Sequence, residues 1–238
     1  MNYRLSILFL VLVICSFAAC KKQNYDVPAQ PAFPPVLNVV NATPDTIDYF
    51  INGTRENNYS DIYADGATNY LYSIFGTENF TFKKAGSQIT LFKQSYSLDT
   101  ATFYSLFFCG TSSNTFLTPD NLGQAVVIDT LANTAAVRFI NASPNAGSVD
   151  VVVSIGTSLS LTNCAFKSVS AFKGLRDTVN DIKVYATGTT QLLKDTSVTF
   201  YSGQAYTLFS KGTPGGKGAA AFGLVVISSD PVIYTQTD

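Results

Sequence analysis

The sequence predicts an all-β protein made of two tandem antiparallel β-sandwich domains behind an N-terminal export segment. Its 238 residues include 18 Phe and 13 Tyr but no Trp and no His, and residues that favour strands outnumber strong helix formers. After residue 35 the chain is a series of short alternating runs broken by Gly, Asn, Asp and Pro, as in sandwiches. The same order of runs occurs twice, about 100 residues apart, which indicates two domains.

The N-terminal segment has the pattern of an export signal. Arg4 precedes an apolar stretch of 13 residues (LSILFLVLVICSF, 5–17), shorter than the ~20 residues that span a bilayer as a helix. Two Ala residues then precede Cys20, which resembles the lipobox of bacterial lipoproteins, with Phe17 at the usual Leu position. The resemblance implies a signal peptide at 1–19 and a lipid (diacylglycerol and an acyl chain such as palmitate) on Cys20, and the two Lys residues that follow indicate the outer membrane. The alternative is an ordinary secretory signal cut at nearly the same place.

The rest of the chain divides into a tether and two domains. Residues 20–35 hold four of the nine prolines and no periodicity, which predicts an extended tether. The first domain, residues 36–130, has predicted strands at 36–41, 46–52, 70–75, 80–84, 89–95, 102–109 and 124–129. The second domain, residues 135–230, has predicted strands at 135–141, 149–155, 166–172, 181–186, 192–200, 205–211 and 221–228. About seven strands in each domain fit a β-sandwich, with the linker at 131–134.

A short motif recurs at the start of each domain, as NATPD (41–45) and NASPN (141–145). Each Pro fixes φ and makes the preceding residue extended, and each Asn can bond neighbouring backbone groups. The Asp one residue into the following strand is expected to accept hydrogen bonds from N–H groups of the turn. A metal or ligand cluster is the alternative, but one acid per copy and no His favour a structural turn. The residues assigned to this turn are Asn41, Pro44, Asp48, Asn141, Pro144 and Asp150.

A family resemblance covers residues 36–228. Residues 137–153 (VRFINASPNAGSVDVVV) and 203–212 (GQAYTLFSKG) resemble domain-of-unknown-function family 4397, an Ig-like module. The first copy (VLNVVNATPDTIDYFING, 36–53) is similar but lacks two residues after its Pro. The resemblance implies two tandem Ig-like β-sandwiches in an exported protein, and it transfers no catalytic residues.

Several kinds of chemistry are disfavoured by composition. Without His there is no imidazole for a catalytic triad or a metal site. The formal net charge is −1 and Lys and Arg are not clustered, which excludes a nucleic-acid partner. The GTPGGKG segment (212–218) lacks the Gly-Lys-Ser/Thr ending of a phosphate loop and is predicted to be a hairpin loop. We therefore expect no enzyme, no cofactor and no metal.

Two cysteines remain beyond the lipid site. Cys109 ends an apolar strand of the first domain, and Cys164 lies in a loop-like segment of the second. Because these places are not equivalent in the repeat, we expect two free thiols and not a disulfide within a domain.

A loop rich in Tyr, Asn and Asp is the candidate ligand-binding segment. Tyr rings beside amides are suited to sugars or peptides, since a ring buries area while its hydroxyl stays hydrogen-bonded. Two acids of the loop are also candidates for a glycosidase pair or a Ca²⁺ site. The alternatives are a solvated loop for the acids and packing for the rings. The candidate residues are Tyr59, Asp61, Tyr63, Asp65, Tyr70 and Tyr72.

Two further expectations concern packing. The run at 102–109 (TFYSLFFC) has apolar residues on both faces, so Phe103, Phe107 and Cys109 are expected to lie against the second repeat. A cover by the first domain's own segment at 111–122 is the alternative. Tyr206 and Tyr104 are expected to act as tyrosine corners, with each hydroxyl bonded to a backbone carbonyl.

The predicted function is that of a lipid-anchored outer-membrane or cell-surface protein that serves as a non-catalytic binding or structural module, in a scaffold or in adhesion. Its partners would be the membrane, through the lipid, and a glycan or another surface protein. The alternative is a glycan-capturing accessory subunit or a glycan-degrading enzyme of a surface uptake system.

Replacing Cys20 by Ser should abolish lipid attachment. In the parent protein, radiolabelled palmitate should enter the chain and the protein should sediment with membranes. In Cys20→Ser both should be lost, whereas Cys15→Ser, a change inside the cleaved segment, should leave both intact. Labelling that persists in Cys20→Ser contradicts the anchor.

Overall fold

The strands fall into two copies of one eight-strand order within residues 33–129, 133–154 and 159–230, the parts that this computed structural model describes. Cys20 and the predicted signal peptide lie outside these residues. The first copy has β1 (Val36–Asn41), β2 (Ile47–Ile51), β3 (Thr54–Arg55), β4 (Leu71–Tyr72), β5 (Gly76–Lys84), β6 (Thr90–Leu98), β7 (Phe103–Phe108) and β8 (Phe116–Pro119). The second has β9 (Thr134–Asn141), β10 (Val149–Ser154), β11 (Leu159–Cys164), β12 (Lys173–Arg176), β13 (Val179–Ala186), β14 (Leu192–Thr199), β15 (Ala205–Lys211) and β16 (Gly223–Ser228). Helix α2 (Leu122–Asp129) lies between the copies in the chain, and a 3₁₀ turn, η1 (Gly218–Ala220), precedes β16.

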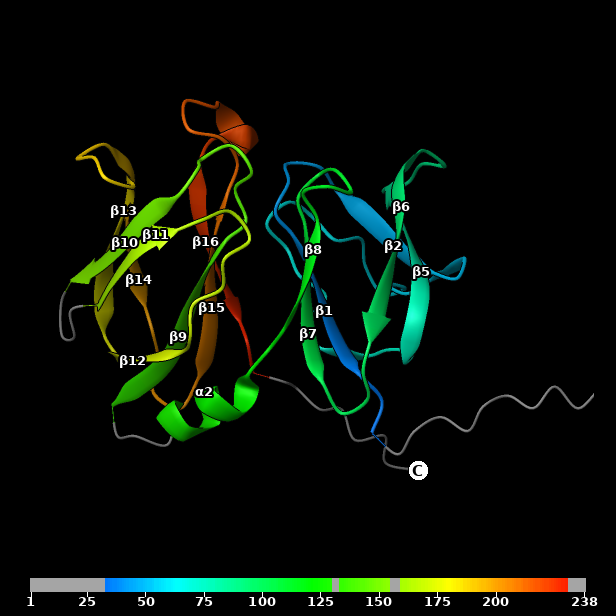
Figure 1. Cartoon of the computed structure of the whole chain (residues 1–238), viewed down its shortest axis with the longest axis horizontal. Helices are drawn as coiled ribbons and strands as arrows, with labels where there is room; N and C mark the ends of the chain where they lie inside the picture. The colour runs from blue at the N-terminus through cyan, green and yellow to red at the C-terminus, as the bar shows by residue number, and fades with distance from the viewer. Residues whose placement is uncertain (1–32, 130–132, 155–158, 231–238) are drawn as a thin grey trace, which may run out of the picture. The chain divides into compact units, whose positions relative to one another are not determined.

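Each copy is a sandwich of two sheets (Figure 1). The strand orders are β4-β1-β7-β8 and β3-β2-β5-β6 in the first copy, and β12-β9-β15-β16 and β11-β10-β13-β14 in the second. β1 pairs with β7, and β9 with β15, in parallel, and the other paired strands are antiparallel. The predicted fold class, all-β with two tandem sandwiches, is confirmed.

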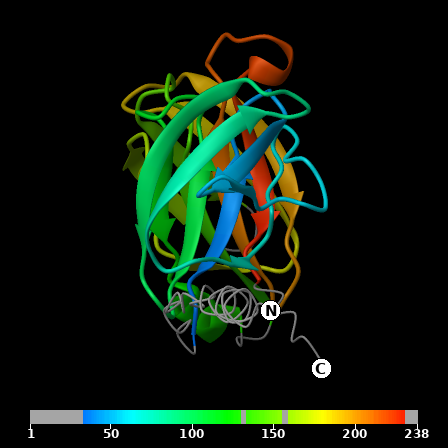
Figure 2. The same ribbon diagram turned by 90° about the vertical axis from the view of Figure 1, so that its right-hand side faces the viewer.

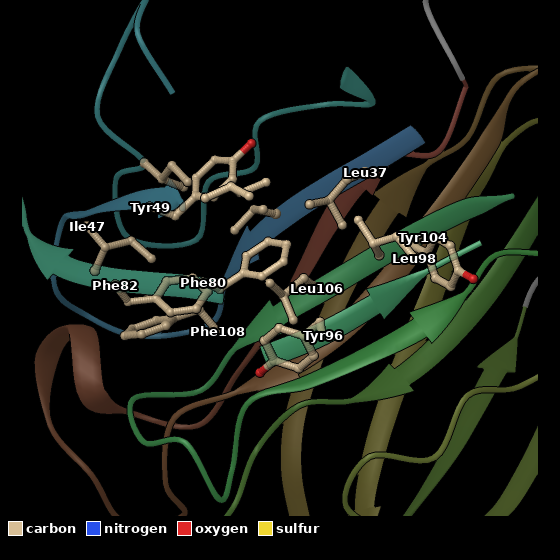
Figure 3. Packing of buried hydrophobic residues seen from close by; sticks show 13 residues of the cluster. Leu37, Ile47, Tyr49, Phe80, Phe82, Tyr96, Leu98, Tyr104, Leu106 and Phe108 are labelled. Carbon is tan, nitrogen blue, oxygen red and sulfur yellow. The ribbon is translucent and has the colours of Figure 1, made fainter. Parts of the chain in front are cut away.

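The core of the first sandwich lies between its two sheets, because alternate residues of each strand point inward. Leu37 of β1, Phe80 and Phe82 of β5, and Leu106 of β7 are fully buried in one cluster, and their side chains converge from both sheets (Figure 3). Val39 of β1 is buried in the same cluster. Figure 2 looks onto the sheet that contains β2, β5 and β6, with β1 behind it. The second sandwich has an equivalent cluster with fewer aromatic rings.

The central strands β1, β7, β9 and β15 are buried on both faces, and the second face of each meets the other copy. The Phe107 and Phe209 rings meet edge to face, with 5.5 Å between centroids, and Phe116 stacks on Phe107 at 5.3 Å. The positions on this shared face correspond between the repeats. They are Val36 and Ala136, Asn38 and Arg138, Val40 and Ile140, Phe103 and Ala205, Ser105 and Thr207, and Phe107 and Phe209.

The expected cover of Phe103, Phe107 and Cys109 is therefore confirmed. Phe107 and Cys109 belong to a buried cluster with Phe209, and Phe103 packs against a second cluster that contains Ala205. The first domain's own segment at 111–122, the alternative cover, contributes too, because its Phe116 belongs to the same cluster as Phe107 and Cys109. Full burial of a Phe side chain is worth about 1.5–3 kcal/mol, so the shared face stabilises both repeats.

A buried ion pair joins the repeats beside these rings. Arg138 Nη1 of β9 lies 2.6 Å from Oδ1 of Asp120, which follows β8, and the two side chains are 2% and 0% exposed. Asp120 Oδ2 accepts hydrogen bonds from the hydroxyls of Tyr70 (2.7 Å) and Ser105 (2.6 Å). Arg138 Nε donates to Thr207 Oγ1 of β15 at 2.8 Å. Buried charges are stable only when paired and hydrogen-bonded in this way.

The strand predicted at 124–129 is wrong, because these residues belong to helix α2. A short apolar run fits a strand or a helix equally well. Two features favour the helix: Asn121 Oδ1 accepts a hydrogen bond from the Gln124 N–H (3.4 Å) at its start, and Leu122 and Ala125, one helical turn apart, pack into the junction.

Three other predicted segments differ from the structure. The segment at 111–122, predicted as a loop, contains strand β8, which pairs with β7. The strand predicted at 166–172 is instead the connection from β11 to β12. Lys167 has a φ value of 70° there, outside the range of regular strands. Cys164 ends β11 and does not lie in a loop.

The two predicted tyrosine corners differ from expectation, because neither hydroxyl bonds a backbone carbonyl among the described residues, and that of Tyr206 donates to Gln204 Oε1 at 3.5 Å. The Asp99 N–H donates to the Tyr104 hydroxyl at 3.2 Å. Burial raises the pKa of Tyr206, and a hydrogen bond from the backbone of Tyr201 opposes that rise. Tyr104 is buried and Tyr206 only half-buried.

Replacing Phe209 by Ala should destabilise both repeats together. Loss of a fully buried Phe costs about 3–5 kcal/mol, and this ring contacts the first repeat. Urea unfolding followed by fluorescence and by circular dichroism should show one transition with a lower midpoint. The control Phe33→Ala, which truncates a ring that is 72% exposed, should leave the midpoint unchanged. A first repeat that keeps its original midpoint in Phe209→Ala would show that the repeats unfold independently.

Candidate functional site

The repeated Asn is the centre of each turn between the first two strands of a copy. Asn41 Nδ2 donates to the carbonyls of Asp45 (2.7 Å), Ile62 and Tyr63 (both 3.1 Å), and its Oδ1 accepts from the Thr43 N–H (3.0 Å). One fully buried amide thus holds its own turn and the connection that crosses between the two sheets.

The second copy has the same arrangement. Asn141 Nδ2 donates to the carbonyls of Gly147 (2.9 Å) and Cys164 (2.8 Å). Its Oδ1 accepts from the Ser143 N–H (3.1 Å) and from the Ser210 hydroxyl (2.8 Å). In both copies the motif has the geometry of a structural turn. Pro44 is exposed at the tip of the first turn, and Pro144 is half-buried at the tip of the second.

The two Asp residues of the motif do not bond the N–H groups of their own turns, contrary to expectation. Asp48 Oδ1 accepts from Arg55 Nη2 (2.6 Å) and Asn57 Nδ2 (2.8 Å). Asp150 Oδ1 accepts from the Asn163 N–H and the Thr187 hydroxyl, both at 2.7 Å. These hydrogen bonds, that from Asn163 above all, lower the pKa of Asp150. The side-chain oxygen of Asn41 or Asn141 already accepts the hydrogen bond from the N–H group of its turn. Each Asp is therefore hydrogen-bonded to segments that neighbour the second strand instead.

The structure separates the six candidate ligand-binding residues. Tyr59 and Tyr63 are exposed in the connection between β3 and β4, and Tyr72 is exposed on β4, an edge strand. Tyr70 is instead buried in the junction, where its hydroxyl donates to Asp120. Burial and the nearby Asp120 carboxylate raise the pKa of Tyr70.

The two acids of the same segment are engaged in separate ion pairs. Asp61 lies 2.6 Å from Arg55 Nη2 of β3, and Asp65 lies 2.8 Å from Lys211 Nζ of β15 in the second repeat. Lys211 thus pairs with Asp65, whereas Arg55 is shared between Asp61 and Asp48. Across the described residues, no three His, Cys, Asp or Glu side chains are grouped to hold a metal ion.

The two copies of the turn line one cavity of about 270 Å³. Thr43 and Pro44 border it from the first repeat, and Pro144, Asn145 and Thr213 from the second. Cys109 also lines it, and burial raises the pKa of this thiol to about 12, so it stays protonated at neutral pH. Loops at the end of a sandwich are where binding residues commonly lie. The lining combines hydroxyl, amide and apolar groups with the carboxylate of Asp45, which suits a small polar ligand.

Sequence reasoning missed Asp120 and Arg138. The signal was present in AAVRFIN, where Arg138 interrupts an otherwise apolar strand between Val137 and Phe139. Its partner Asp120 follows strand β8, which was not predicted, so the ion pair could not be recognised from the sequence. Cys109 and Cys164 are free, buried and half-buried respectively. None of the helices found among the described residues is long and apolar enough to cross a membrane.

The model of the domain of unknown function DUF4397, the family resembled above, matches residues 35–152 and 135–236. The chain belongs to this family. No curated protein matches the DUF4397 chain. Among solved structures, it is similar to CBMbc, a family CBM26 domain from Eubacterium rectale Amy13K in complex with maltoheptaose, with 10% identity over 83% of this chain and 98% of that one. The TM-score is 0.29, and a similarity at that level carries no argument about ligand or activity.

Replacing Asn141 by Ala should cost about 2–4 kcal/mol, because four hydrogen bonds of a buried amide are lost. Asn145→Ala is the matched control in the same turn. The Asn145 side chain is exposed and donates to Thr213 Oγ1 at 3.1 Å, so its loss should cost under ~1 kcal/mol. Chemical denaturation of both variants measures the difference. Equal destabilisation would show that the repeated Asn has no special structural role.

Proposed function

We propose that this DUF4397 chain is a non-catalytic binding or structural module, anchored by a lipid on Cys20 at the outer membrane or cell surface. The tether at 20–35 would hold the paired sandwiches away from the lipid, since its prolines favour extended conformations. The module would present its loops to a glycan or to another surface protein.

The observation that carries this proposal is the buried contact between the repeats. Two free sandwiches would present loops at variable separation. Here Phe107 and Phe209 pack together, and the Asp120–Arg138 pair is buried beside them. A rigid arrangement loses little conformational entropy on binding, which favours recognition.

Capture of a glycan is the second candidate. Tyr59 and Tyr63 are 104% and 64% exposed in one connection, and exposed aromatic rings provide flat apolar surfaces for sugar rings. An accessory subunit of a glycan uptake system would use such a surface. Asp61 and Asp65 are each paired with a cation, which disfavours them as the catalytic acids of a glycan-degrading enzyme. The exposed rings therefore favour glycan capture.

A glycan and peptide array probed with residues 21–238 tests both roles. A ligand that uses the exposed loop should bind about two- to tenfold more weakly to Tyr59→Ala or Tyr63→Ala, because an aromatic contact is worth about 0.5–1.5 kcal/mol. Tyr201→Ala is the matched control, since Tyr201 is also 64% exposed but lies in the second repeat. An array on which nothing binds contradicts a role in recognition, and equal losses in all three variants contradict the role of the loop.

A further inference from the structure

The chain leaves the last strand of each sandwich at equivalent places. After β8 the Asp120 N–H donates to the Phe103 carbonyl, and after β16 the Ser229 N–H donates to the Ala205 carbonyl, both at 2.8 Å. Phe103 and Ala205 are equivalent positions of the shared face. The residues that follow Asp120 therefore correspond to those that follow Ser229.

In the first repeat this following segment is helix α2, which covers one end of the second sandwich. α2 contacts β9, β12 and β15, and it lies at the end of the sandwich where β9 begins (Figure 1). Its Leu122 and Ala125 share a buried cluster with Ala136 and Ala205. In the sheet, Ala136 lies between Ala205 of β15 and Gly174 of β12, so small side chains make room for the helix.

The equivalent row of the first sandwich carries large side chains, and no helix of the described residues occupies the corresponding place on it. Val36 lies between Phe103 of β7 and Tyr72 of β4. Phe103 and Val36 are half-buried, and Tyr72 is 60% exposed. Ile74 and Phe75, which follow β4, are exposed as well. These five residues, here called the open end, form an apolar surface of the kind that usually marks an interface.

The segment that corresponds to α2 in the second repeat is residues 231–238 (PVIYTQTD). It starts beside the open end, because Asp230 Oδ1 accepts a hydrogen bond from the Ala205 N–H at 2.9 Å. Ala205 belongs to the cluster against which Val36 and Phe103 pack. Eight extended residues reach about 26 Å, and a row of three strands is only about 10 Å wide, so the segment is long enough to cross the open end.

The composition of this segment suits an apolar surface. Val232, Ile233 and Tyr234 are consecutive, and Asp238 has its only charged side chain. The DUF4397 model matches as far as residue 236, so the repeat of the family includes these apolar residues. Because the segment is attached beside the open end, its effective concentration there is roughly millimolar, which favours it over a partner free in solution.

We propose that residues 231–238 bind across the open end of the first sandwich, where Val232, Ile233 and Tyr234 cover Tyr72 and its apolar neighbours. Each repeat is then closed by the segment that follows the last strand of the other repeat. This inference does not depend on the function proposed above.

The fluorescence of a single Trp tests the proposal on residues 21–238, because the chain has no Trp of its own. Tyr72→Trp places the reporter at the open end. Acrylamide should quench it at least about twofold more strongly in a chain that stops after Asp230, because burial of a ring excludes the quencher. Tyr63→Trp is the matched reporter, since Tyr63 is 64% exposed but lies in the connection between β3 and β4. Its quenching should not change.

Point variants of the longer chain separate loss of the contact from loss of the fold. Ile233→Ser with Tyr234→Ser should raise the quenching of the open-end reporter as truncation does. Thr235→Ala with Thr237→Ala, a change of polar residues in the same segment, should not. If the shortened chain loses its circular dichroism spectrum, the point variants decide alone.

Equal quenching of the open-end reporter with the segment intact, removed or made polar overturns the proposal. Protection that appears only as the protein concentration rises would show a second copy on the open end. Protection that appears only with phosphatidylcholine vesicles would show a lipid surface there. Either of these results also overturns the proposal.

Discussion

Two opposite charges are buried where the repeats meet, and the cost of burying them constrains how the repeats dock. Removing an ion from water costs several kcal/mol in real proteins unless partners replace the water. Asp120 and Arg138 find those partners in Tyr70 and Ser105 of the first repeat and Thr207 of the second. Apolar contacts such as that between Phe107 and Phe209 are non-directional and would tolerate a shift along the face. The ion pair and its hydrogen bonds are directional, so a shift along the face would break them, and they specify the docking that the apolar contacts stabilise.

The docked pair has features that neither DUF4397 copy has alone. The cavity between the turns is lined by Thr43 and Pro44 of one copy and by Pro144 and Asn145 of the other. Another cavity, of about 250 Å³, is lined by Asn121 and Gln124 together with residues of the second sandwich such as Arg138. Duplication has therefore produced more than two equal sandwiches in one chain. It has created composite surfaces whose geometry depends on the shared face.

Much of the fold follows from local sequence, whereas the sites follow from contacts distant in the chain. Alternating runs with turn residues predicted the two sandwiches, and the two apolar faces of 102–109 predicted the contact between them. Helix α2 was missed because a short apolar run has no distinctive period. Tyr70 was a candidate for ligand binding with packing as the alternative, and the sequence could not decide between them because its partner Asp120 is 50 residues away. Arg138 was overlooked for the same reason, since only the folded chain brings Asp120 to it.

The shared face is built from the same positions in each repeat, as Val40 and Ile140 or Phe107 and Phe209 illustrate. A contact in which equivalent surfaces meet has the character of the isologous interface of a two-fold homodimer. The two halves of this chain thus form an internal pseudo-dimer, with a covalent connection where a homodimer would have two chains. Such a face is complementary to the corresponding face of any other copy. When the halves separate, the first repeat of one molecule can meet the second repeat of another, so exchange of whole sandwiches is the form of misassembly to which this architecture is exposed.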